Sequence, residues 1–354
     1  MNQKFRIASI TSLLGLAGIV LFLISPYRAF AAPPAIEKPR LVLAVGGQQS
    51  LPYLALNVAW KIGAFKAEGL DVDIQNLSGG GDALKALIGG SADVVSGFYD
   101  HVIQMQARGE KVRAVVLQQR YPGLVLIVSP QAVKAGVKTV RDLKGKTIGV
   151  SALGSSTHFF VNHVLGQAGL KPEDFSVMGV GVGTTAVAAF QSGKIDALSV
   201  LEPSLTMLQQ SGRVGAILAD TRTKAGSEAV FGGAYPSATV YVKEAFLQKN
   251  PRTVQAVVNA MIRALEWQHS HSAEDVAKLM PPEYLQGNRP AFVQAVNNML
   301  DSYSPDGRVD LAAVTNLVQV LGSDPKIKAA NISVPDTYDP QFVEAYWRKQ
   351  KAIR

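Results

Sequence analysis

Hydrophobic residues between positions 145 and 203 follow two alternating patterns. In two stretches, one of which holds Phe160 and Val164, they recur every three or four positions, which is typical of helices. Around these stretches they form short, continuous runs, which are typical of parallel strands buried on both faces. The runs cover residues 147–150, 175–180 and 195–200. The alternation predicts a βαβαβ unit with a parallel sheet.

Each of these three predicted strands is followed by a turn of small or polar residues. The turns contain Ser155, Ser156 and Thr157, then Gly183 and Thr184, then Glu202. The carboxyl ends of parallel strands share one edge of a sheet, where ligands bind. The three hydroxyls either cap the next helix or contact a ligand, and three exceed what capping needs. Glu202 either contacts a ligand or caps the helix that follows.

An earlier part of the chain repeats this order of elements. We expect strands at residues 41–45, 71–77, 93–96 and 112–117, and helices at 51–65, 83–88 and 101–108. Two further apolar runs, at residues 124–128 and 238–242, are placed to cross between the two sets. The sequence therefore predicts a first lobe of residues 36–124 plus 238–354 and a second, inserted lobe of residues 125–237. Two crossing segments make a hinge suited to closure of one lobe on the other.

The rest of the chain is helical in pattern. Helices are expected at residues 245–269, with a new start at Asn250 and Pro251, and at 273–280, 290–300 and 311–321. We expect these helices to cover the first lobe.

The N-terminal 31 residues have the features of a secretory signal peptide. Lys4 and Arg6 precede an apolar run at residues 7–24, and residues 29–31 form an A-x-A cleavage site. We expect cleavage before Ala32 and a periplasmic mature protein. Retention as a membrane anchor is the alternative, because about 18 apolar residues is the lower limit for crossing a bilayer.

Composition and charge narrow the function further. The chain has no cysteine, which excludes disulfides, thiolate metal sites and thiol nucleophiles. The net charge of +8 falls to 8 − 3 = +5 once Lys4, Arg6 and Arg28 are removed, and the basic residues are scattered, so we expect no nucleic-acid partner. Five histidines form no HExxH motif, and no metal or cofactor is expected. The glycines of residues 181–186 fit a loose dinucleotide fingerprint, but a tight turn explains them better.

Several segments together carry a family resemblance. They are residues 79–95 (GGGDALKALIGGSADVV), 189–197 (AFQSGKIDA), 142–150 (DLKGKTIGV), the Gly-Ser-Ser-Thr turn at 154–157, the Glu-Pro pair at 202–203 and residues 337–343 (TYDPQFV). In kind and order they resemble the nitrate, sulfonate and taurine family of ABC-transporter substrate-binding proteins. The resemblance covers nearly the whole mature chain.

The resemblance implies an α/β fold: a bilobal type II periplasmic-binding-protein fold, with two open sheets joined by a two-strand hinge. It implies a monomer that captures a small organic anion, such as a sulfonate, taurine or a carboxylate, and delivers it to an ABC permease in the inner membrane. No chemistry is implied. The ligand-binding residues it suggests are Gln48, Gln49, Gly80, Gly81, Phe98, Gln119, Ser155, Ser156, Thr157, Gly183, Thr184, Glu202 and Tyr235.

Some alternatives stay open. None of the matching turns contains Arg or Lys, which argues against a doubly charged anion, although Arg120 is placed to reach in from the crossing. A periplasmic sensor subunit that feeds a signalling receptor would use the same closure. The third alternative is an enzyme like the fungal thiamine-pyrimidine synthases, but their signature contains cysteines and this chain has none.

Overall fold

The computed structural model describes residues 35–353. The predicted signal peptide, residues 1–31, lies outside the described residues. Residues Ile36–Arg354 form one compact unit. Within residues 35–353, no helix combines the length and the apolar character that crossing a bilayer requires.

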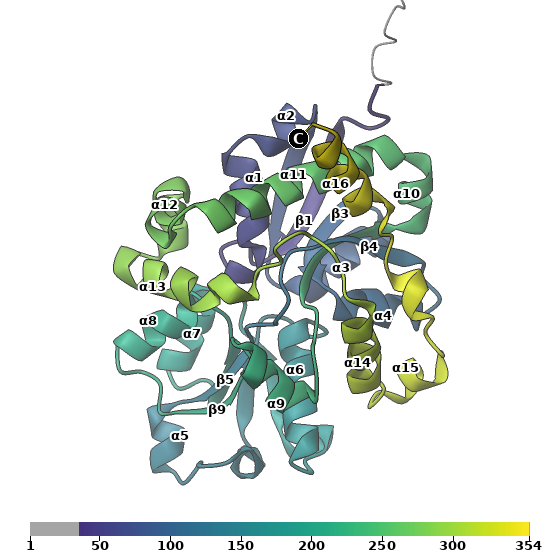
Figure 1. The fold of residues 1–354 in the computed structure, drawn as a ribbon. Helices are drawn as coiled ribbons and strands as arrows, with labels where there is room; N and C mark the ends of the chain where they lie inside the picture. The colour runs from purple at the N-terminus through teal and green to yellow at the C-terminus, as the bar shows by residue number, and fades with distance from the viewer. Residues whose placement is uncertain (1–34, 354) are drawn as a thin grey trace, which may run out of the picture. The chain divides into compact units, whose positions relative to one another are not determined.

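Two five-stranded sheets organise this unit (Figure 1). Their strand orders are β2-β1-β3-β10-β4 and β7-β6-β8-β5-β9, so the two sheets have the same topology. The strands are β1 (Arg40–Gly46), β2 (Asp71–Leu77), β3 (Val94–Phe98), β4 (Val112–Leu117), β5 (Val125–Val128), β6 (Thr147–Val150), β7 (Ser176–Gly179), β8 (Ala197–Val200), β9 (Ala216–Asp220) and β10 (Ala238–Lys243). We call the first sheet and its helices the first lobe, and the second sheet and its helices the second lobe.

The parallel unit predicted from the sequence is present in the second sheet. Strand β6 pairs in parallel with β7 and with β8, as the βαβαβ pattern requires. In the first sheet β1 pairs in parallel with β2 and β3. The remaining pairs are antiparallel: β5 lies between β8 and β9, and β10 lies between β3 and β4. Each sheet therefore takes one antiparallel strand from a crossing segment.

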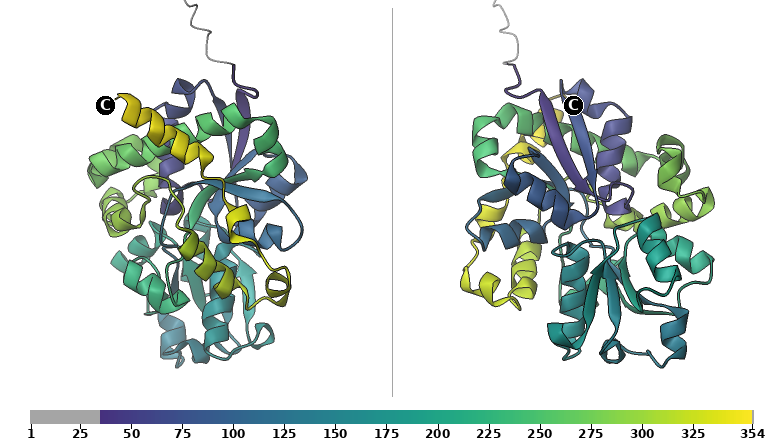
Figure 2. Two further views of the ribbon diagram at one scale, coloured as in Figure 1. Left: turned by 45° about the vertical axis from the view of Figure 1, so that its right-hand side comes forward. Right: turned by 180° about the vertical axis from the view of Figure 1, so that it is seen from behind.

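Helices cover both sheets and continue to the C-terminus (Figure 2). They are α1 (Leu54–Lys61), α2 (Ala64–Ala67), α3 (Gly80–Gly89), α4 (Asp100–Gln106), α5 (Pro130–Lys134), α6 (Ser156–Gln167), α7 (Thr184–Gln191), α8 (Ser204–Gln210), α9 (Lys224–Phe231), α10 (Glu244–Lys249), α11 (Pro251–Ser270), α12 (Ala273–Leu279), α13 (Arg289–Met299), α14 (Leu311–Leu321), α15 (Pro325–Ala329) and α16 (Gln341–Ile353).

Strand β5 shows how the sequence pattern builds the core. Alternate side chains of a strand point to opposite faces of its sheet. Leu126 and Val128 join the main hydrophobic core, whereas Val125 and Ile127 join a smaller cluster on the other face of the second sheet. All four side chains are fully buried. The continuous apolar run is thus explained by a strand covered on both faces.

Three expectations need correction. The helix expected at residues 51–65 is interrupted, because Gly63 adopts a left-handed φ of 73° between α1 and α2. Strand β3 continues to Phe98, so this residue lies in the sheet and not in the turn after it. The C-terminal helices do not cover the first lobe alone, because α13 contacts α8 and α14 contacts α9 of the second lobe. Figure 1 shows α13 next to α8.

The two crossing segments lie side by side where the chain passes between the sheets. The Ser237 backbone N–H donates to the Gln119 carbonyl at 3.1 Å, and the Ser237 hydroxyl donates to the Tyr121 carbonyl at 2.9 Å. These bonds hold the entry and exit of the second lobe together. The residue bounds predicted for the lobes stay a prediction, because residues Ile36–Arg354 pack as one unit.

Candidate functional site

The carboxyl ends of strands from both sheets meet at the contact between the lobes, which we call the seam. The Leu51 backbone N–H, from the turn after β1, donates to the Glu202 carbonyl, from the turn after β8, at 2.9 Å. The turns after β1 and β2 also pack against the turns after β6 and β7. The strand edges that the sequence suggested for ligand binding therefore face each other.

Glycines of the first lobe allow this close approach. A Cβ atom added at Gly81 would lie 2.8 Å from the Leu153 carbonyl oxygen of the second lobe. A Cβ atom at Gly79 would lie 2.8 Å from the Ala152 Cβ. Real Cβ atoms do not approach other atoms this closely, so any side chain at these positions would push the lobes apart.

A small cavity lined by hydroxyl groups lies in the seam, and we call it the hydroxyl cavity. Its open space is about 20 Å³, which is enough for one water molecule. Ser199 of β8 is one of the residues that line this cavity, and its hydroxyl is buried without a hydrogen-bond partner among the described residues. The hydroxyl-bearing residues of the lining are Ser50 from the first lobe and Ser151, Thr157, Ser199 and Ser204 from the second.

The three hydroxyls at the start of α6 have different partners. Ser155 Oγ donates to the Ala152 carbonyl at 2.7 Å, and Thr157 Oγ1 accepts from the Ser151 N–H at 2.9 Å. These two bonds stay within the second lobe and shape the turn. Ser156 Oγ donates across the seam to Asp100 Oδ1 at 2.8 Å. One hydroxyl of the three thus joins the lobes.

Asp100 and His101 follow β3 directly and are both fully buried. His101 Nδ1 lies 3.1 Å from the Tyr241 hydroxyl, and His101 Nε2 lies 3.9 Å from Asp100 Oδ1. Within the described residues, Asp100 Oδ2 and His101 Nε2 have no hydrogen-bond partner. An unpaired buried polar atom costs about 1–3 kcal/mol. Two such atoms on neighbouring residues need an explanation, and a bound ligand or water is one.

Burial controls the protonation of this pair. It raises the pKa of the Asp100 carboxyl, although the charge of His101 and the bond from Ser156 act in the opposite direction. Burial lowers the pKa of His101, against the effect of the Asp100 charge. Burial, and secondly the Asp100 charge, raises the pKa of Tyr53 and Tyr235, so both phenols stay neutral at pH 7.

The aromatic residues suggested as ligand contacts pack on the protein itself. The ring of Phe98 meets the ring of Tyr53 edge to face, with 6.2 Å between centroids. Tyr235 stacks on Phe231, with 4.0 Å between ring centroids. Both Phe98 and Tyr235 are buried.

The other suggested residues divide between the seam and the surrounding structure. Gly80 packs against a residue of its own lobe, since a Cβ atom there would come within 2.8 Å of His101 Cε1. Gln49 reaches Gly183 across the seam, whereas Thr184 is exposed. Gln48 donates to Asn57 Oδ1 at 2.9 Å, and Gln119 donates to Ser302 Oγ at 2.8 Å. These two amides therefore stabilise the first lobe and the crossing.

Glu202 is buried and bonded to its own lobe. Its Oε2 accepts from the Thr206 N–H at 2.9 Å, and its Oε1 accepts from Arg222 Nη1 at 3.0 Å. The carboxylate thus caps α8 inside the protein and pairs with a cation. Arg120, which the sequence placed within reach of the site, is exposed and donates to the Asp301 carbonyl at 2.6 Å.

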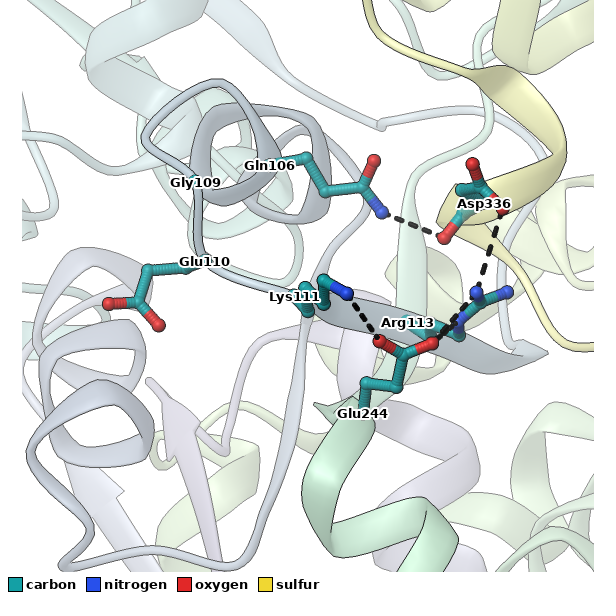
Figure 3. Close-up of a pocket in the computed structure, with 7 residues that line it drawn as sticks. All are labelled: Gln106, Gly109, Glu110, Lys111, Arg113, Glu244 and Asp336. Atoms are coloured by element: carbon teal, nitrogen blue, oxygen red, sulfur yellow. Dashed lines mark hydrogen bonds and ion pairs between the residues drawn. The ribbon is translucent and has the colours of Figure 1, made fainter.

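An open pocket of about 330 Å³ lies on the first lobe, away from the seam (Figure 3). Four of its five charged side chains are paired with one another: Arg113 lies 2.8 Å from Glu244 and 3.6 Å from Asp336, and Lys111 lies 3.8 Å from Glu244. Gln106 donates to the Asp336 carbonyl at 2.8 Å. The remaining charged residue, Glu110, belongs to the same lobe. The pocket therefore joins no two lobes, and the seam remains the better candidate site.

Sequence reasoning missed Asp100, His101 and Ser199. The first two stand at the carboxyl edge of β3, just after the Phe98 that was chosen, so the same edge rule applied two residues further would have found them. Ser199 lies inside an apolar run. Nothing in the neighbouring residues indicates that this position belongs to the lining of the cavity. Tyr241 belongs to the crossing strand β10, and only the sheet order brings it to His101.

Comparison with known proteins adds independent information. Residues 53–275 match the protein family described as NMT1/THI5 like. A solved structure from Bordetella bronchiseptica RB50 is 39% identical, covers 90% of this chain and 100% of its own, and has a TM-score of 0.87. A Bacillus subtilis (strain 168) protein whose name describes it as a binding protein, YtlA, is 26% identical over 73% of this chain and 75% of its own.

Two further relatives differ in what their names describe. The alkanesulfonate-binding protein SsuA of Xanthomonas axonopodis pv. citri, solved with MOPS, is 18% identical with a TM-score of 0.66, over 86% of this chain and 100% of its own. The 4-amino-5-hydroxymethyl-2-methylpyrimidine phosphate synthase THI13 of Saccharomyces cerevisiae (strain ATCC 204508 / S288c) is 24% identical over 62% of this chain and 64% of its own. The fold is the bilobal α/β fold of periplasmic binding proteins, as expected.

Proposed function

Because the chain belongs to the NMT1/THI5-like family, we propose that it is the solute-binding protein of an ABC importer. It captures a small solute in the seam and delivers the solute to a permease in the inner membrane. The observation that carries this proposal is the buried hydrogen bond from Ser156 to Asp100, which joins the lobes at 2.8 Å. A solute that binds there contacts both lobes at once, and can therefore favour the closed form.

The hydroxyl cavity supports an organic anion as the solute, of sulfonate, taurine or carboxylate type. The cavity lies at the start of α6, a helix of 12 residues whose first N–H groups attract negative charge. The Ser199 hydroxyl has a free hydrogen to donate to an oxyanion. The name of SsuA describes alkanesulfonate binding, which is consistent with this class.

Closure takes place about the two crossing segments. The seam has room for only one water molecule, so a solute of several heavy atoms requires the lobes to separate first. The crossings are joined by the bonds of Ser237 to Gln119 and Tyr121, and they carry the rotation while the sheets stay rigid. In the same proposal the first lobe spans residues 36–124 plus 238–354, the second lobe spans 125–237, and a cleaved signal peptide delivers the protein to the periplasm.

An enzyme is the second candidate, because the yeast relative THI13 is named as a pyrimidine phosphate synthase. The absence of cysteine from this chain argues against a chemistry that depends on thiols. Turnover decides between the two functions: a binding protein releases the solute unchanged, and mass spectrometry of the bound and released compound tests this directly. A sensor subunit would bind the same solute and differ only in the protein partner that recognises the closed form.

The test is a thermal-shift screen of residues 32–354, after unfolding and refolding to remove carried-over solute. The panel contains nitrate, taurine, alkyl and aryl sulfonates, carboxylates and pyrimidines. A true solute at 100 times its Kd stabilises the folded state by about 2.7 kcal/mol. Absence of a shift with every compound would overturn the proposed solute classes.

Ser199→Ala makes the screen specific for the seam. Because Ser199 Oγ has no partner within residues 35–353, its removal is expected to leave the free energy of unfolding unchanged or slightly higher. If the hydroxyl binds the solute, affinity falls roughly fivefold to tenfold. Ser176→Ala, at an exposed position, is the matched control and is expected to change neither quantity. Equal affinity of Ser199→Ala and the wild type would place the solute elsewhere.

A further inference from the structure

We propose that the seam selects solutes that carry an ammonium or amidinium group, and that Asp100 Oδ2 and His101 Nε2 accept hydrogen bonds from this group. The inference rests on the proposed function and deepens it. It predicts that an anion without such a nitrogen is a poor solute for this protein.

The first argument is charge balance. Asp100 is fully buried, and the ionisable group paired with it in the described residues is His101, with 3.9 Å between His101 Nε2 and Asp100 Oδ1. Ser156 donates one hydrogen bond to the carboxylate, and Oδ2 has none. A buried carboxylate without a cation or a full set of donors is strongly destabilising. A bound ammonium or amidinium group supplies both the charge and the missing donors.

The second argument is the tautomer of the His101 imidazole, which decides whether Nε2 is a donor or an acceptor. When Nδ1 of His101 carries the proton and donates to the Tyr241 hydroxyl at 3.1 Å, Nε2 is an acceptor. Burial favours the neutral ring, which keeps this acceptor available. Nε2 of His101 and Oδ2 of Asp100 then give two buried acceptors on neighbouring residues, and an amidinium or an ammonium group has several N–H donors to offer them.

The third argument is access. Gly80 has no side chain over the His101 ring, and a Cβ there would lie 2.8 Å from Cε1. From the other lobe, the Ser156 hydroxyl covers Oδ1 of Asp100. In this proposal, opening the lobes breaks the bond from Ser156 and gives an entering solute access to the Asp100 carboxyl.

The hydroxyl cavity and this nitrogen site adjoin the same turn of α6. Thr157 lines the cavity, and Ser156 contacts Asp100. A solute with an anionic end and a cationic end could therefore occupy both. In this arrangement the second lobe binds the anionic end of the solute, and the first lobe binds the nitrogen group.

The experiment is isothermal titration with three pairs of compounds that differ only in the nitrogen group. The pairs are ethanesulfonate and taurine, butyrate and 4-aminobutyrate, and benzoate and 4-amidinobenzoate. At least one nitrogen-bearing compound is expected to bind more than tenfold tighter than its partner. Asp100→Asn should weaken that compound roughly 10- to 100-fold, because a charge-assisted hydrogen bond is lost. Asp71→Asn, at an exposed carboxylate, is the matched control.

His101→Asn provides a second variant. Its shorter amide can keep a bond to Tyr241 but removes Nε2, so it should also reduce the preference for the nitrogen-bearing compound. Two outcomes overturn the inference while the proposed function stands: nitrogen-free partners that bind as tightly, or a preference that survives both variants. If none of the six compounds binds, the inference also fails, and the separate thermal-shift screen decides the proposed function.

Discussion

Glu202 is a residue whose carboxylate is fully used by its own lobe. It accepts from the backbone of Thr206 and from Arg222, and it is buried. Removing it leaves a helix N–H without its acceptor and takes from Arg222 one of its two carboxylate partners, the other being Asp220. We expect Glu202→Ala to lower the free energy of unfolding by about 2–3 kcal/mol, measured by urea denaturation. The exposed Glu173→Ala is the control, and a loss no larger than in this control would contradict the capping role.

His101 makes stability depend on pH in a defined direction. Its pKa in the folded state is lowered from 6.5, so below pH 6.5 the unfolded chain takes up a proton that the folded chain excludes. Its contribution to stability is complete above pH 6.5 and is lost as the pH falls toward the folded pKa. His158 and His163 act in the same direction because burial lowers their pKa values too.

His101→Asn tests this contribution. The loss of stability between pH 6.5 and pH 5 should become less steep, by at most about 1.4 kcal/mol per pH unit for one proton. Urea denaturation at closely spaced pH values measures the slope. The raised pKa of Asp100 acts in the opposite direction, since protonation favours its buried form. An unchanged slope in His101→Asn would show that His101 is not excluded from protonation in the folded state.

Individual residues show what the sequence could and could not reveal. The turn of Ser155, Ser156 and Thr157 was recognisable because its type and place follow from local rules. Which hydroxyl crosses to Asp100 depends on the contact between lobes, and no local pattern encodes it. Glu202 had two equal explanations from sequence, and the position of Arg222, 20 residues later, supplies the difference.

At the scale of elements, two of the three glycines of helix α3 have different surroundings. A side chain at Gly81 would press on the Leu153 carbonyl across the seam, whereas Gly89, at the other end of the helix, has nothing within 4 Å. Gly89→Ala should therefore be neutral or stabilise the helix by up to about 1 kcal/mol. Gly81→Ala should hold the lobes apart and weaken solute binding. Small-angle scattering measures the separation of the lobes, and titration measures the solute affinity. Equal behaviour of the two variants would contradict the close approach of Gly81 to Leu153.

Helices and strands were predictable where the local sequence alone determines the secondary structure. The strands of the βαβαβ unit were found because their apolar runs are continuous, and α14 was found at Leu311–Leu321 because its period is regular. The errors arose where tertiary contacts decide. Phe98 is drawn into β3 by pairing with Ala238, and α13 leaves the first lobe to contact α8. Neither partner lies near in sequence.

At the scale of the whole molecule, the buried charge of Asp100 opposes closure when no solute is present. Closing the seam removes the carboxylate from water and leaves Oδ2 without a donor. Asp100→Asn removes the charge and should shift the solute-free protein toward the closed form. A smaller radius of gyration than the wild type, by small-angle scattering, is the expected result. An unchanged radius would indicate that other contacts set the position of the lobes.

The chain enters and leaves the second lobe at one place, where Ser237 bonds to Gln119 and Tyr121. All five strands of the second sheet lie between these two points in the sequence. We expect the second lobe to be exchangeable as a unit if its contacts with α13 and α14 are kept. A corresponding lobe from a relative, joined at the same two points, would exchange one half of the recognition surface and leave the other half intact. New specificities could then arise by recombination of halves, without change to the hinge.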